Sequence, residues 1–300
     1  MRGKGLERSH PARMPKFGRN RPHPSLVEKV SRFAKYRTTE ALVVPDAWDY
    51  SVLATAALAT MLANGPDDTV TIDPYAKANG LGCCTCAAPG HSLDVITAGG
   101  ENPAIITADQ VITLYCLSCG YVIGQPSTDQ GGDELTVLNY IAANGIDGKG
   151  LHQIAGVANA DATNTQEVRE GIFLTGSGQI CLELPNVYVN PFPGPDQVWD
   201  VGTGADYEPN DQQGHCVDLD GSFTTNGPNG QPAFGGDTWG IPIWITTRAL
   251  AYYCAAAQNG SVNFLLTKEW ISKSKGTAPN SLDWTGLASD FPQVGGAVAP

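Results

Sequence analysis

Three cysteines that directly follow a glycine-rich turn are the feature that most constrains this chain. Cys83, Cys84 and Cys86 lie within residues 79–91, which read NGLGCCTCAAPGH. The two alanines after Cys86 are typical of the start of a tightly packed helix. A thiol at a helix N-terminus lies near the positive end of the helix dipole, which favours the thiolate over the thiol. The stretch therefore predicts a cysteine nucleophile at the start of a buried helix.

The rest of the sequence places helices first and strands later. Hydrophobic spacing and capping residues predict helices near residues 26–35, 51–63, 84–98, 108–121, 134–143, 164–173, 247–257 and 282–291, the third of them bent at Pro89. Strands are expected at residues 151–157, 179–184, 214–220, 238–245 and 262–267, with long surface loops at 186–213 and 224–237. This order predicts an α+β fold, in which N-terminal helices, including the cysteine helix, pack on a mostly antiparallel sheet.

The net charge of -12 is distributed unevenly along the chain. Residues 1–37 hold 11 of the 18 Lys and Arg residues and only two acidic ones, so the remaining body carries a charge near -21. Such a body should not bind nucleic acid nonspecifically, because phosphate contacts need basic side chains. The basic N-terminal arm could bind an acidic partner, nucleic acid or its own body. Since it has few apolar residues with which to form a core, we expect it to become ordered against another protein subunit.

Targeting signals and membrane segments are not evident. No apolar region follows the basic N-terminus, as a secretory signal would require. The longest apolar run, residues 51–63, is too short to cross a bilayer and predicts a buried helix. We therefore expect the protein to be made in the cytoplasm and not to associate with a membrane. Eight cysteines in 300 residues are too few for a disulfide scaffold.

Two later stretches extend the pattern that begins at Cys84. A Gly-His pair at residues 214–215 opens a predicted strand, and Asp-Thr-Trp-Gly follows at residues 237–240. A cysteine at the start of a helix, then Gly-His, then a polar residue shortly before Trp-Gly, resembles the papain-like cysteine peptidase fold. The resemblance covers roughly residues 70–270. It also extends to a group of phage-encoded papain-fold proteins of similar length.

The resemblance implies a catalytic site without a metal or other cofactor. Cys84 would be the nucleophile and His215 the general base that takes its proton. Asp237, at a position where the classical members have Asn, would orient the imidazole. Asn79 and the backbone N–H of Cys84 would hold the developing oxyanion of a peptide or amide substrate.

The other cysteines have simpler interpretations. Four of them lie in apolar surroundings and are interpreted as buried small hydrophobic residues: Cys86, Cys181, Cys216 and Cys254. Cys116 and Cys119 form a C-x-x-C on a predicted helix, where packing is again the commoner reason. A zinc site built from Cys83, Cys84, Cys86, Cys116 and Cys119 is an alternative, but the paired C-x-x-C motifs of zinc sites do not occur. The sequence leaves the disulfide state of Cys83, Cys86, Cys116 and Cys119 open.

Three functional hypotheses follow, and all of them use the same division of the chain into three parts. Residues 1–37 form the basic arm, residues 38–276 the papain-like domain and residues 277–300 a C-terminal tail. The first hypothesis is a bacteriophage virion component, associated with capsid or tail, whose arm contacts other subunits. The alternative is an active cysteine peptidase or amidase that uses Cys84, His215 and Asp237. A third, weaker interpretation is a redox or zinc protein based on the C-x-x-C.

Overall fold

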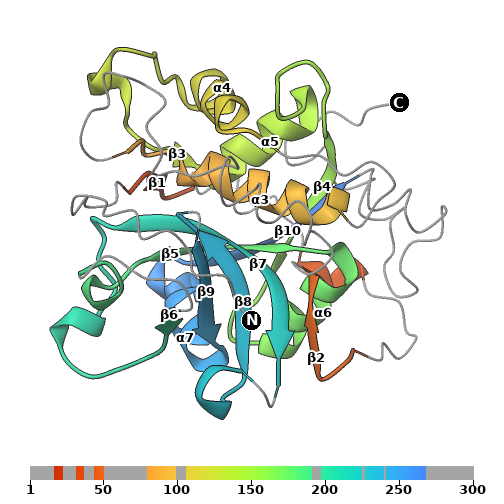
Figure 1. The fold of residues 1–300 in the computed structure, drawn as a ribbon, viewed down its shortest axis with the longest axis vertical. Helices are drawn as coiled ribbons and strands as arrows, with labels where there is room; N and C mark the ends of the chain where they lie inside the picture. The colour runs from red at the N-terminus through yellow and green to blue at the C-terminus, as the bar shows by residue number, and fades with distance from the viewer. Residues whose placement is uncertain are drawn as a thin grey trace, which may run out of the picture.

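The protein has two lobes with one helix between them. The structure is a computed structural model that describes residues 17–22, 32–36, 44–50, 80–98, 106–190, 197–224, 227–239 and 241–267. One lobe consists of α4 (Ala108–Cys119) and α5 (Glu134–Asn144), and the other of a large sheet with α6 (Thr165–Thr175) and α7 (Thr247–Tyr253). Helix α3 (Cys84–Ala98) runs between them and packs on strand β7 (Figure 1).

The main sheet is antiparallel with a single parallel pair among the described strands. Its strand order is β4-β10-β5-β7-β8-β9-β6, with β2 also paired to β7, and β6 and β9 are the parallel neighbours. The strands are β2 (Ala47–Asp49), β4 (Ile154–Ala160), β5 (Gly178–Glu183), β6 (Gln197–Trp199), β7 (Gly214–Phe223), β8 (Ala233–Thr238), β9 (Ile241–Thr246) and β10 (Ser261–Thr267). A separate parallel pair joins β1 (Arg19–Asn20) to β3 (Gly132–Asp133). The predicted α+β class with a mostly antiparallel sheet is therefore confirmed.

Short 3-10 helices occupy several of the connections. They are η1 (Phe33–Tyr36), η3 (Pro126–Thr128), η4 (Asn186–Tyr188), η5 (Ala205–Tyr207), η6 (Pro228–Gly230) and η7 (Ala256–Gln258). Within the described residues, no helix is long and apolar enough to cross a membrane.

Local sequence explains where the helices begin. The side chain of Thr107 accepts a hydrogen bond from the Gln110 N–H, and the side-chain oxygen of Gln110 accepts one from the Thr107 N–H, which closes a capping box at the start of α4. Asp133 caps α5 by accepting from two backbone N–H groups, and Asn164 caps α6 by accepting from the N–H of Glu167. Helix α3 continues past Pro89 to Ala98, in agreement with the predicted extent.

The structure differs from the predicted elements in the second half of the chain. The single strand expected at residues 238–245 is two strands, β8 and β9, because the chain turns at Trp239 with a positive φ of 52°. Both expected loops contain strands: β6 lies within 186–213, and most of β8 lies within 224–237. The strand predicted at 151–157 is β4, three residues later. The helices predicted at 51–63 and 282–291 lie outside the described residues, as does most of the one at 26–35.

The two faces of β7 have different partners, because successive side chains of a strand point to opposite sides. Val217 and Leu219 belong to the large apolar cluster that includes side chains of α6 and α7. Cys216 packs with Cys84 of α3, and Asp218 accepts a hydrogen bond of 2.6 Å from Ser92 of the same helix. This second face is therefore polar, and it positions α3 on the sheet.

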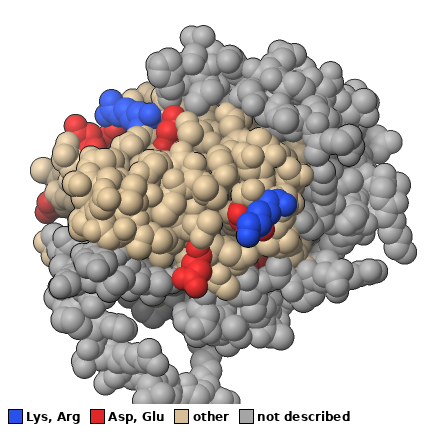
Figure 2. All heavy atoms as spheres, turned by 90° about the horizontal axis from the view of Figure 1, so that it is seen from above, with Lys and Arg blue, Asp and Glu red and all other residues tan. Residues whose placement is uncertain are grey.

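Many of the acidic residues are buried rather than displayed. The buried carboxyl groups include Asp94, Asp218, Asp220, Asp237 and Glu134. Viewed from the side of α4, the described surface carries few charged side chains (Figure 2). Part of the negative charge that the sequence assigns to the body therefore belongs to groups that are withdrawn from water.

These buried carboxyls should make the protein less stable as the pH rises from 5 to 8. Burial raises the pKa of Asp94 to about 8 and that of Asp218 to about 7. Both groups then keep a proton in the folded state at a pH where the unfolded chain has lost it, so their contribution is full below about pH 4 and is lost as the pH rises through 7–8. We expect the free energy of unfolding in urea to fall by roughly 3 kcal/mol for each of the two groups, or about 6 kcal/mol in total, over this range.

The variant Asp94→Asn is the matched test of this pH dependence. An amide oxygen keeps the acceptor for the Ile106 N–H, which lies 2.6 Å from Asp94 Oδ1, but it does not ionise. The slope of stability against pH should therefore flatten. Equal slopes in the variant and the parent protein would contradict the assignment.

Candidate active site

Cys84 is the first residue of α3 and is 1% exposed. The helix begins here because the carbonyl oxygen of Cys83 accepts hydrogen bonds from the N–H groups of Cys86 and Ala87. The first N–H groups of a helix have no partner within the helix, so they leave a positive end beside the thiol of Cys84. The predicted position of this cysteine, at the start of a buried helix, is confirmed.

The structure brings Cys84 together with His215. Burial alone would raise the pKa of the Cys84 thiol, but hydrogen bonds from Cys216 and His215, together with the charge of His215, bring it well below its ordinary value. A thiolate paired with an imidazolium is the arrangement that makes a cysteine a nucleophile. These two residues are 131 positions apart and meet because α3 packs on β7.

The imidazole of His215 is held from two sides. Its Nε2 lies 2.6 Å from the hydroxyl oxygen of Thr238, and its ring stacks on Trp239 with centroids 4.3 Å apart and an interplanar angle of 16°. Phe17 contacts both rings edge-on, at 6.0 Å from His215 and 6.2 Å from Trp239. The Thr-Trp pair at the end of β8 therefore fixes the ring orientation.

Asp237 does not have the expected place behind the imidazole. Neighbouring residues of a strand face opposite sides, so Asp237 and Thr238 project to different sides of β8. Asp237 pairs across the sheet with Asp218, and burial and the charge of Asp49 raise its pKa to about 6. The hydrogen bond that the sequence assigned to Asp237 is thus made by Thr238.

Sequence reasoning missed two residues of the site and assigned one that lies outside the described part of the chain. Thr238 was passed over because the resemblance pointed to the polar residue before it; strand alternation was the signal that would have separated the two. Cys216 was interpreted as a buried hydrophobic residue, although its place directly after His215 puts it near the nucleophile. Asn79, the expected oxyanion residue, lies outside the described residues.

The described part of the basic arm lies across this site. The backbone of Gly18 is packed so closely on Gly82 that a Cβ at Gly18 would be 1.7 Å from the Gly82 oxygen. The Gly18 oxygen accepts a hydrogen bond of 2.6 Å from Gly132 N–H. On the other side, a Cβ at Gly214 would be 2.4 Å from the Arg19 oxygen. Residues 17–22 therefore run between the start of α3 and the start of β7, and the ring of Phe17 lies against His215.

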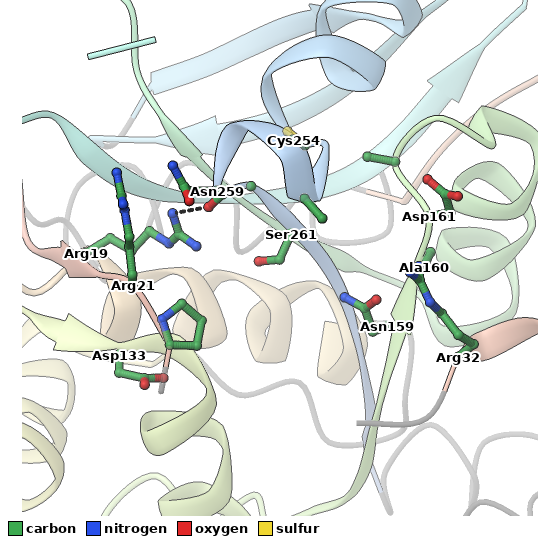
Figure 3. Close-up of a pocket in the computed structure, with 14 residues that line it drawn as sticks. Arg19, Arg21, Arg32, Asp133, Asn159, Ala160, Asp161, Cys254, Asn259 and Ser261 are labelled. Carbon is green, nitrogen blue, oxygen red and sulfur yellow. Dashed lines mark hydrogen bonds between the residues drawn. The ribbon is translucent and has the colours of Figure 1, made fainter. Parts of the chain in front are cut away.

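Charged contacts hold this segment to its own chain. The guanidinium of Arg19 is buried and donates to both carboxylate oxygens of Glu134, at 3.3 and 3.1 Å, and to the carbonyl oxygen of Asn259 at 2.7 Å (Figure 3). Arg21 donates to Glu183 at 2.6 Å. Arg19 and Arg21 also line one end of a cavity of about 650 Å³ that Arg32 borders at the other end (Figure 3). The expectation that the arm is ordered only against another subunit thus differs from the structure at residues 17–22, which bind their own acidic body.

One group of potential metal ligands occurs among the described residues. Glu134, Cys181 and Cys216 bring their ligand atoms within 4.8 Å of one another. Arg19 already donates to both oxygens of Glu134, so its guanidinium supplies the positive charge there. Across the described part of the chain, the zinc set considered for residues 83–119 forms no such group.

Comparisons with known proteins identify the fold. No protein-family model and no curated protein sequence matches the chain. Xylellain, a cysteine protease from Xylella fastidiosa, superposes with a TM-score of 0.54 at 10% identity, over 86% of this chain and 98% of xylellain. ProCathepsin B S9 from Trypanosoma congolense gives 0.52 at 13% identity, over 84% and 87%. A mite allergen structure, from work on Blo t 1 and Der p 1, gives 0.50 at 12% identity, over 80% and 76%.

These similarities show the fold alone, because all three identities are low. The protein has the papain-like fold of cysteine proteases, as the sequence predicted. These structures do not show the finer resemblance to phage-encoded members, which stays a prediction.

Proposed function

We propose that the protein is a cysteine peptidase or amidase that is held latent by residues 17–22. The observation that carries the proposal is the interaction of Cys84, at the N-terminus of α3, with His215 on β7. The papain-like fold supports it, since xylellain has the same fold and is a cysteine protease.

The site's own groups can perform the steps of acyl transfer. His215 takes the proton of Cys84, and the hydroxyl of Thr238 and the ring of Trp239 hold the imidazole in place for that transfer. The thiolate attacks the scissile carbonyl carbon and forms a tetrahedral intermediate, whose oxyanion is stabilised by backbone N–H groups at the start of α3. His215 then protonates the leaving amine, and water hydrolyses the thioester.

The arm indicates the substrate class and the resting state. Its backbone pairs in parallel with β3 and passes the start of α3, so this path already accommodates an extended polypeptide. A peptide substrate would take the same path. Because the segment covers Cys84 and His215, turnover requires its displacement or cleavage.

Alkylation by iodoacetamide at pH 6 tests the nucleophile, with every variant made in a Gly18→Ala background so that residues 17–22 no longer block access to Cys84. An ordinary thiol, with a pKa near 8.5, is almost fully protonated at this pH, so Cys84 should react roughly 100-fold faster than an unactivated cysteine. His215→Ala should remove this advantage and Thr238→Ala should reduce it, while Cys86→Ala serves as the matched control. Hydrolysis of a fluorogenic peptide library, absent in Cys84→Ala, would then identify the substrate. Equal and slow labelling of all eight cysteines, unchanged in His215→Ala, would refute the proposal.

The virion role predicted from the sequence has no supporting observation in the fold, the site or the comparisons. Contact of the arm with other subunits likewise stays a prediction, and it concerns mainly the part of residues 1–37 outside the described ranges. The peptidase proposal rests instead on the interaction of Cys84 with His215.

A further inference from the structure

Three sulfur atoms gather at the nucleophile. A small buried cluster, separate from the two large cores, consists of Cys84, Ala88, Cys181 and Cys216. Cys216 directly follows His215 on β7, and Cys181 lies opposite it on the neighbouring strand β5. The sulfur atoms of Cys181 and Cys216 are 2.7 Å apart, and both cysteines are free thiols. Hydrolysis needs only Cys84, so the other two thiols have no assigned task.

The backbone places Cys181 and Cys216 in the geometry that permits a disulfide. The N–H of Leu184 donates to the oxygen of Gln213 at 2.9 Å, in continuation of the same ladder. Hydrogen-bonded and non-hydrogen-bonded pairs alternate along an antiparallel ladder, so Cys181 and Cys216, three positions further, form a non-hydrogen-bonded pair. Such pairs have Cα atoms about 4.5 Å apart, which lies within the range of disulfides.

Cys216 occupies the middle of the cluster. It hydrogen bonds to Cys84 on one side and to Cys181 on the other, so each outer thiol has the same neighbour. Arg19 and Glu134 also border the pair Cys181–Cys216 and contribute opposite charges. A two-electron oxidation that begins at Cys84 therefore has a continuous path of sulfur contacts to Cys181.

We propose that Cys84, Cys216 and Cys181 form a thiol relay that reduces a hydroperoxide and stores the oxidation as a Cys181–Cys216 disulfide. The oxidant is hydrogen peroxide or an organic hydroperoxide. This activity uses the thiolate of Cys84 but needs no peptide substrate, so it goes beyond the proposed hydrolysis.

The chemistry balances in three steps. The Cys84 thiolate attacks the peroxide; an S–O bond forms, the O–O bond breaks, and the alkoxide or hydroxide takes a proton from His215, which leaves a sulfenic acid. The sulfur of Cys216 then attacks that of Cys84; the S–S bond forms, and the hydroxyl leaves as water with the Cys216 proton. Finally Cys181 attacks Cys216, Cys84 departs as a thiolate, and the Cys181 proton returns to His215. In sum, two thiols and one hydroperoxide yield one disulfide, one alcohol or water from the peroxide, and one water.

The relay would restore the nucleophile after oxidation. A cysteine sulfenic acid without a partner thiol proceeds to sulfinic acid, which is irreversible in most proteins. Transfer of the oxidation to Cys181 and Cys216 returns Cys84 to its reactive form. A thiol reductant could then reduce the stored disulfide by exchange.

Peroxide titration of the reduced full-length protein tests the relay. One equivalent of hydrogen peroxide is added at pH 7, remaining thiols are alkylated, and disulfides are mapped by mass spectrometry under non-reducing conditions. We expect a Cys181–Cys216 disulfide and a Cys84 that is still alkylated. A sulfinic acid on Cys84 with Cys181 and Cys216 still reduced, or no reaction at any of the three, would overturn the proposal.

Single variants separate a relay from direct oxidation. Cys181→Ser should trap a Cys84–Cys216 disulfide, and Cys216→Ser should leave a sulfenic acid on Cys84 that dimedone labels. Cys84→Ser should slow formation of the Cys181–Cys216 disulfide at least tenfold, whereas Cys86→Ala, the matched control, should behave as the parent. If the disulfide forms equally fast in Cys84→Ser, the pair is oxidised directly and the relay is wrong. Because the readout is a disulfide, failure of peptide hydrolysis would not affect the result.

Discussion

Replacing Arg19 with alanine should lower the free energy of unfolding by about 3–5 kcal/mol. Arg19 and Glu134 have side chains that are only 2% and 1% exposed, and Arg19 supplies hydrogen bonds to both oxygens of the carboxylate. Without the guanidinium, Glu134 keeps the hydrogen bond from Ser261 but is left as a buried charge. Removing one partner of a buried pair costs far more than the pair contributes by itself, because the remaining charge is stranded away from water. Urea unfolding at pH 7 measures the effect.

The neighbouring arginine provides the matched control. The side chain of Arg21 is 58% exposed and pairs with Glu183, so Arg21→Ala should change stability by less than about 1 kcal/mol. The double variant Arg19→Ala/Glu134→Ala should recover part of the loss in Arg19→Ala, since no charge is then left unpaired. If Arg19→Ala and Arg21→Ala are equally mild, the buried pair is not what fixes the segment to the fold.

Features that depend on local chemistry were predicted well from the sequence. The caps at Thr107 and Asp133 act within three residues, so the helices that they begin could be located directly. The cysteine helix was recognised in the same way from its glycine turn and small residues. The meeting of Cys84 with His215 was predicted from the order of short motifs, and the packing of α3 on β7 brings the two together.

Features that depend on strand alternation or on distant partners could not be predicted. Whether Asp237 or Thr238 faces the imidazole depends on which residues of β8 point to each face of the sheet. The sequence had placed the start of this strand inside a loop, so the alternation could not be assigned. The partner of Arg19 is 115 residues away in the sequence. The composition of a basic arm does not show whether the arm binds its own chain or another subunit. The contact between Cys181 and Cys216 follows from the register of β5 and β7, which single sequences do not reveal.

Replacing Gly18 with alanine should uncover the active site. The added Cβ would be 1.7 Å from the backbone oxygen of Gly82, a contact that no side-chain rotation can relieve. The segment must therefore move, which breaks the hydrogen bond from Gly132 N–H to Gly18 O and withdraws Phe17 from His215. Alkylation of Cys84 by a bulky maleimide at pH 6 should become at least about tenfold faster, because a covered thiol reacts only when its cover opens. If the peptidase proposal is right, hydrolysis should rise with it.

Two further variants keep this experiment interpretable. Asn20→Ala lies in the same segment but has an exposed side chain, so it should leave the labelling rate close to that of the parent. Phe17→Ala removes the ring over His215 and Trp239 but keeps the backbone in place, and it should give a smaller increase than Gly18→Ala. A melting curve for each protein separates local uncovering, where the cooperative transition persists, from loss of the fold. An unchanged labelling rate in a folded Gly18→Ala protein would show that residues 17–22 do not control access to Cys84, and latency would then need another cause.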